Sequence, residues 1–174
     1  MKRMLWLLFS LLLISSVAMA DHIGIYSDAT GQSCQLGNIA GQFSTSATVI
    51  HKYASGATAS RFKATFPAGT VFIGLVSPYI LVGALPTDLS LGYGQCRSGC
   101  IVLGTLNAFY GVGTLQILAA DGQANILYAD CSFTEHPASG GTAAVNVPGE
   151  CLDNDGCTVA VEPSTWGSVK SLYR

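Results

Sequence analysis

Apolar and polar residues alternate along several stretches of the chain. The clearest case is Ala59–Phe66, in which the apolar residues Phe62 and Phe66 share one face. The charged residues Arg61 and Lys63 fall on the opposite face. This period of two is typical of a β-strand with one side toward a core and the other toward solvent.

Similar segments recur along the chain, separated by clusters of glycine, proline and other turn-forming residues. The expected strands include His22–Tyr26, Thr45–Tyr53, Leu89–Tyr93, Cys100–Tyr110, Leu115–Ala119, Asn125–Cys131 and Thr142–Val147. Two further apolar runs, Val71–Val76 and Tyr79–Val82, are short and are separated by Ser77-Pro78. About eight or nine short strands with such punctuation predict an all-β fold, an antiparallel immunoglobulin-like β-sandwich.

Some local features sharpen this expectation. Cys100–Tyr110 is so uniformly apolar that we expect it to be buried on both faces for much of its length. Asp121-Gly122 lies between two expected strands and predicts a hairpin that joins them. Ser55-Gly56 is expected to end a strand, and Pro137–Gly141 to be a loop.

The end of the chain differs from the rest. Trp166, Val169 and Tyr173 are spaced as on one face of a helix, and Ser164 or Thr165 can cap its start. The segment is too short to be a stable helix alone. We therefore expect residues 161–174 to form a short C-terminal helix or an extended tail.

The first twenty residues have the pattern of an export signal. Lys2 and Arg3 precede the apolar stretch Leu5–Val17, and Ala18-Met19-Ala20 is a small-residue cleavage site. The predicted organisation is a signal peptide over residues 1–20, one disulfide-bonded β-sandwich domain over 21–160, and a Trp-bearing tail over 161–174. The protein is therefore expected to be secreted or periplasmic.

Charge and hydropathy restrict the partners. Without Lys2 and Arg3, the six basic and ten acidic residues that remain give a formal charge of −4. No basic stripe is present, so nucleic acid is not an expected partner. No second apolar stretch is long enough for a helix to span a bilayer, so no membrane span is expected after signal cleavage.

The cysteine count indicates disulfides. Six cysteines in an exported chain predict three disulfides, among fifteen possible pairings. The six are Cys34, Cys96, Cys100, Cys131, Cys151 and Cys157. Their spacing does not fit a zinc site or a Cys-x-x-Cys redox pair. We expect Cys151 to bond either Cys131 or Cys157, which would fix the last strand to the tail.

The strongest candidate for a metal site is the acidic run near the C-terminus. Asp153, Asp155 and Glu162 occupy positions 3, 5 and 12 of a calcium-loop template. Cys151 takes the first position and supplies no carboxylate. An acidic turn exposed to solvent is therefore the competing interpretation, and no cofactor is expected.

Catalytic motifs are weak. The chain has no G-x-S-x-G motif, and its strands carry too few acids for a glycosidase pair. His51 lies in an expected strand, where we predict a sheet-surface position, and His136 precedes Pro137 in an expected loop. Trp166 and six tyrosines could form a sugar-binding platform, although most aromatic residues in a sandwich belong to its core. The six are Tyr26, Tyr53, Tyr79, Tyr93, Tyr110 and Tyr128.

A resemblance supports part of this picture. The chain ends in Val161-Glu-Pro-Ser-Thr-Trp-Gly-Ser-Val-Lys-Ser-Leu-Tyr173. This segment resembles the V-E-x-x-T-W-G-x-[IV]-K-x-L-Y end of a group of short, uncharacterised secreted bacterial proteins. Tyr53–Phe66 is also similar to strands of cohesin-like and other immunoglobulin-like modules. The resemblance implies secretion and one β-rich domain, and it transfers no functional residue.

These observations favour a non-enzymatic interaction or structural module of the cell envelope or exterior. Its partner would be an unidentified protein or envelope component, and self-association is possible because low charge does little to oppose pairing of sheet edges. The alternative is a ligand-binding module for a glycan or for calcium. A hydrolase of unrecognised type ranks below both, and whether the protein is an enzyme stays open.

Overall fold

The computed structural model describes residues 21–37, 46–149 and 156–157. These residues form ten strands and no helix, so the predicted all-β sandwich is confirmed. The strands are β1 (His22–Tyr26), β2 (Gln35–Leu36), β3 (Ser46–Thr65), β4 (Val71–Val76), β5 (Ile80–Ala84), β6 (Asp88–Phe109), β7 (Gly113–Leu118), β8 (Ile126–Asp130), β9 (Glu135–Gly140) and β10 (Thr142–Val145). The expected signal peptide and the expected helix or tail lie outside the described residues.

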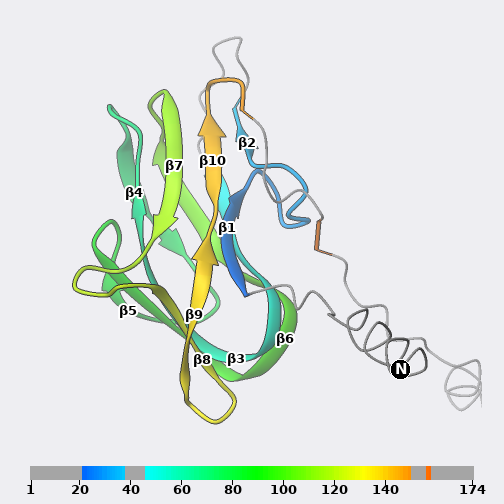
Figure 1. Ribbon diagram of the computed structural model, residues 1–174. Helices are drawn as coiled ribbons and strands as arrows, with labels where there is room; N and C mark the ends of the chain where they lie inside the picture. Colours follow the sequence, from blue (N-terminus) through cyan, green and yellow to red (C-terminus); the bar gives the residue numbers. More distant parts are fainter. Residues whose placement is uncertain (1–20, 38–45, 150–155, 158–174) are drawn as a thin grey trace, which may run out of the picture.

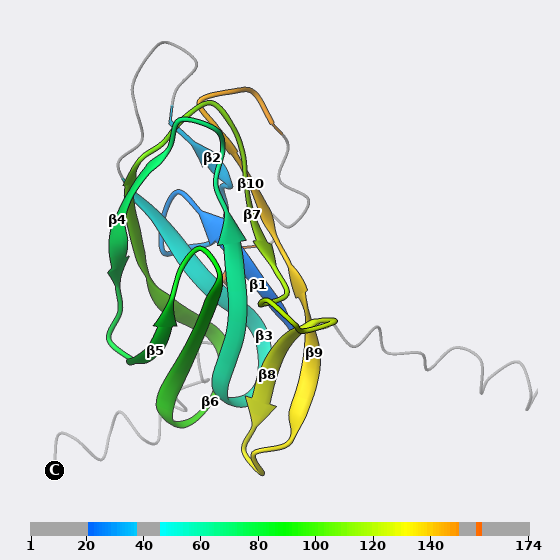
Figure 2. The ribbon, with the colours of Figure 1, turned by 90° about the vertical axis from the view of Figure 1, so that its left-hand side faces the viewer.

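Two long antiparallel strands form the centre of the sandwich. β3 has 20 residues and β6 has 22, and they pair from Ser46 opposite Asn107 to Phe62 opposite Leu89. Four shifts of register interrupt this ladder between Val49 and Ala59. Such irregularities bend and twist a strand pair. Figures 1 and 2 show β3 and β6 folding back at the lower end of the molecule, so each contributes to both layers.

The prediction that Ser55-Gly56 ends a strand is therefore wrong. The two expected strands around it are one strand, β3, and Gly56 lies within the bend with a φ of 111°. A side chain at Gly56 would approach Cys131 Sγ to 2.9 Å. Glycine is required here for the bend itself, because it alone accepts this backbone conformation without strain.

The layers follow from this bend. The first half of β3 and the second half of β6 form one layer with β1 and β4. The second half of β3 and the first half of β6 form the other layer with β5 and β8. β7, β10 and β2 extend the second layer from the end of β3.

The two sides of the sandwich end differently. On one side β1 pairs with β9 in parallel, which joins the two layers. On the other side β4 and β5 each pair only with β6 among the described strands. We call this second side, formed by Val71–Val76 and Ile80–Ala84, the open side (Figure 1, left).

The hairpin predicted around Asp121-Gly122 is wrong. β7 pairs with β3 and β10, whereas β8 pairs with β3 and β9. A turn does form at Asp121-Gly122, but β3 supplies successive pairing sites for both flanking strands, so they do not pair with each other. The prediction of a loop over Pro137–Gly141 is also wrong, since most of this segment belongs to β9.

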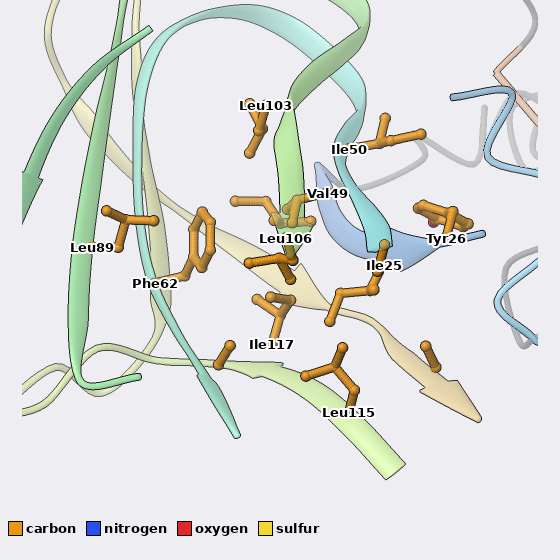
Figure 3. Close-up of a cluster of buried hydrophobic side chains, with 14 of the residues drawn as sticks. Ile25, Tyr26, Val49, Ile50, Phe62, Leu89, Leu103, Leu106, Leu115 and Ile117 are labelled. Atoms are coloured by element: carbon orange, nitrogen blue, oxygen red, sulfur yellow. The ribbon is translucent and has the colours of Figure 1, made fainter. Parts of the chain in front are cut away.

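The core lies between the layers. Figure 3 shows Val49, Phe62 and Leu106 among its side chains, and all three are fully buried. Phe62 alternates with the partly exposed Arg61 and Lys63, as the sequence predicts. The second half of β6 is not buried on both faces, because Val102 and Phe109 face solvent.

Two disulfides join β6 to more distant parts of the chain. Cys96 bonds Cys131 at the end of β8, and Cys100 bonds Cys157. The predicted pairing of Cys151 with Cys131 or Cys157 is therefore wrong. Cys34 is also disulfide-bonded, and Cys151 lies outside the described residues. Disulfides of this kind fit a protein of an oxidising compartment.

The Cys100–Cys157 bond closes a sequence separation of 57 residues. Replacing both cysteines by serine should lower the free energy of unfolding by about 2–4 kcal/mol, since the cross-link restricts the unfolded chain. Chemical denaturation measures this loss, and peptide mapping under non-reducing conditions checks the pairing. A peptide that links Cys157 to any cysteine other than Cys100 would contradict the structure.

Candidate functional site

The predicted metal ligands cannot be placed, because Asp153, Asp155 and Glu162 lie outside the described residues. Within the part of the chain that the structure describes, no three His, Cys, Asp or Glu residues come together to hold a metal ion. Over the same residues, no helix is long and apolar enough to cross a membrane.

His51 is buried, and the prediction of a sheet-surface position is wrong. Ile50, His51 and Lys52 are all fully buried, because β3 bends here and both of its faces are covered. The side chain of Lys52 also points inward, where Nζ donates to Gly31 O at 2.8 Å and lies 4.3 Å from the centre of the Tyr26 ring.

A hydrogen-bonded network surrounds His51. Its Nε2 lies 2.9 Å from Asp21 Oδ1, and its Nδ1 lies 3.1 Å from the Tyr93 hydroxyl. Burial raises the pKa of Tyr93 well above its usual range, so the hydroxyl keeps its proton and can donate to Nδ1. His51 Nε2–H then donates to Asp21. Each ring nitrogen therefore has a partner, which is what a buried polar group requires. The network therefore connects Asp21, the residue before β1, to the bend of β3.

His136 lies in β9 rather than in a loop. Its Nε2 is 2.9 Å from Asp130 Oδ2, and Asp130 Oδ1 accepts the backbone N–H groups of Ser132 and Thr134. The His136 ring, with the Thr134 and Ser132 N–H groups, holds the pKa of the Asp130 carboxyl below its usual range. Asp130 thus fixes the turn between β8 and β9. Phe133, exposed on this turn, is an isolated apolar residue of a kind common on protein surfaces.

His22 and Ser139 form a histidine–serine hydrogen bond that sequence reasoning missed. His22 Nδ1 lies 2.8 Å from Ser139 Oγ. The two line a cavity of about 260 Å³ together with Gly140 and Gly141. The N–H groups of Ser139 and Gly141 already donate to Asp21 O and Ile23 O, so neither is available to stabilise an oxyanion. This geometry does not favour acyl transfer.

The tyrosines do not form a sugar-binding platform in the described residues. Tyr26, Tyr93, Tyr110 and Tyr128 are buried, and Tyr53 and Tyr79 are partly buried. The Tyr79 ring lies 5.1 Å from that of Tyr93. Trp166 lies outside these residues. The aromatic residues that the structure places here therefore belong mainly to the core.

The most unusual surface is the open side. Six large apolar side chains on or beside its strands are between 57% and 69% exposed. They are Val71, Ile73, Val76, Ile80, Val82 and Phe109. Monomeric proteins rarely concentrate exposed apolar residues in this way unless the surface binds something.

The open side also carries no charge. No charged residue occurs between Lys63 and Asp88, a segment that contains both β4 and β5. Soluble proteins usually protect a free sheet edge with charged residues, because its unpaired N–H and C=O groups can pair with another strand. β4 and β5 lack this protection, which makes the open side the candidate functional site.

No protein-family model matches this chain, and neither a curated protein nor a solved structure is significantly similar to it. The function is therefore inferred from the chemistry of the open side.

Replacing Asp21 by alanine should destabilise the fold, because the His51 N–H would lose its acceptor in the core. The expected loss is about 1–3 kcal/mol in the free energy of unfolding. Asp21→Asn is the matched control, since its amide oxygen can still accept this bond. Equal stabilities of the two variants in chemical denaturation would argue against the network.

Asp130 should stabilise the fold in a pH-dependent way. Because its pKa is lowered on folding, its contribution is present at neutral pH and is lost as the pH falls through the lowered pKa. Asp130→Asn should therefore be less stable than the wild type at pH 7, and the difference should shrink below about pH 4. Urea midpoints across this range test the prediction, and parallel curves for the two proteins would contradict it.

Proposed function

We propose that the protein is a secreted, non-enzymatic interaction module that binds a protein partner by strand addition at the open side. The observation that carries this proposal is the pair of uncharged edges of β4 and β5, which no other described strand covers, with their exposed apolar side chains. The disulfides support an extracellular or periplasmic location.

Strand addition explains both features of the open side. The unpaired backbone groups of an edge strand supply hydrogen bonds to an added strand, and side chains beside it supply specificity. An added strand would also cover the aliphatic side chains of β4 and β5. The absence of charge indicates a partner segment that is itself uncharged and apolar, because a buried charge without a counter-charge is costly.

The exposed positions lie where an added strand would reach them. Val71 is opposite Phe109 on β6, and both face solvent. Val76 is opposite Thr105, and Val82 is opposite Ser90, both polar and only partly exposed. The apolar strip is therefore about one strand wide along much of its length, which suits a strand beside the edge better than a partner lying on the sheet face.

Site-specific photo-crosslinking in the exported protein tests the proposal. A benzophenone side chain at Ile73 or Val82 should form a covalent protein adduct, whereas the same group at Thr114, exposed on β7, should not. The Val82 adduct should disappear when Ile80 is replaced by lysine, because a charge at the edge opposes pairing. Equal adducts at Thr114, or none at the edge positions, would contradict the proposal.

A further inference from the structure

β5 is the more regular of the two free edges. Its ladder with β6 runs without a shift from Ile80 opposite Gly92 to Ala84 opposite Asp88. The ladder of β4 is interrupted by a shift between Phe72 and Gly74. A bulge makes an edge less able to accept another strand, so pairing with a new strand is easier at β5.

All five residues of β5 are exposed, on both faces of the strand. Ile80 and Val82 point to the outer face, whereas Leu81 lies on the side of its buried partner Leu91. Gly83 has a φ of 83°, so the regular extended part of the edge is Ile80–Val82. A strand placed beside these residues would cover apolar side chains on both faces at once.

The sequence of this edge is suited to its own copy. In an antiparallel pair of β5 strands centred on Leu81, Leu81 lies opposite Leu81 of the second copy, and Ile80 lies opposite Val82. Each of these positions then meets an aliphatic side chain of similar size. No charged residue occurs in the sequence between Lys63 and Asp88, so β5 itself carries no charge that would repel the copy.

We infer that the partner at β5 is a second copy of this chain, paired antiparallel through Ile80–Val82 about a two-fold axis. This inference rests on the proposed function and names its partner. A two-fold contact uses the same surface on both copies and closes after two, because neither β5 edge then stays free. The second layer continues from one copy into the other through β6, β5 and the two partner strands.

The interface is small for a permanent dimer. Three residues of regular edge and their neighbours cover less area than the roughly 800 Å² per partner of a stable complex. A weak, concentration-dependent dimer is therefore expected.

Sedimentation of the purified mature protein over a hundredfold range of concentration, about 1 to 100 µM, tests the inference. The wild type should pass from monomer toward dimer. Val82→Lys should weaken the dimer about a hundredfold, since both copies lose an apolar contact and place an amine at the interface. Ile80→Lys should weaken the dimer to the same extent. Agreement between the two variants would show that the weakening does not come from a structural change specific to one of them.

Val112→Lys is the matched control. Val112 is 61% exposed and Val82 is 65% exposed, but Val112 lies outside β4 and β5. This variant should dimerise as the wild type does. Far-ultraviolet circular dichroism should show that all variants are folded. A wild type that stays monomeric throughout, or equal weakening by Val82→Lys and Val112→Lys, would overturn the inference.

Crosslinking at Leu81 separates this inference from the proposed function. A benzophenone at this position should give an adduct with twice the mass of the chain. An adduct of another mass would overturn the second copy as partner and would leave strand addition at the open side in place. No adduct at Leu81, Ile73 or Val82 would overturn both.

Discussion

The antiparallel pairing of β3 with β6 is the constraint on which the rest of the structure depends. Strands of 20 and 22 residues would each span about 65–70 Å if they were straight, more than twice the diameter of a small domain. They must bend to enclose a core, and the register shifts between Val49 and Ala59 allow this. Every other strand of the described fold except β2, β9 and β10 pairs directly with one of these two.

The bend explains where the polar and covalent links of the molecule lie. At the bend both faces of β3 are covered, so His51 and Lys52 are buried one after the other and need polar partners inside the core. Asp21, Tyr93 and Gly31 supply these partners. Cys96 and Cys100, which bond Cys131 and Cys157, also lie near the bend of β6, where the ladder of backbone hydrogen bonds is least regular.

The same arrangement leaves one side of the sandwich unprotected. β1 and β9 join the layers on one side, but β4 and β5 follow the outer edge of β6 and meet no further strand among those described. The large aliphatic side chains exposed on β4 and β5 contribute little to the core, because most of their surface faces solvent. Exposed aliphatic side chains lower the solubility of a protein, and a strand that covered them would remove this disadvantage. Among the described residues, none of the three histidines belongs to a complete catalytic arrangement.

The sequence by itself determined the strand content, most strand positions and the class of fold, because the period of two depends only on which side chains face the core. It also determined that β4 and β5 are apolar and uncharged.

Only the tertiary structure decided that β3 and β6 are continuous through Ser55-Gly56 and Gly94–Gly99, since a glycine that ends one strand can equally well bend another. Strand partners and cysteine pairs depend on contacts between distant residues, which local patterns do not specify. For that reason the hairpin at Asp121-Gly122, the surface position of His51 and the partner of Cys131 were predicted wrongly. The apolar runs of β4 and β5 could equally have formed the core, and it is their place at the outer edge of β6 that makes them a candidate binding surface.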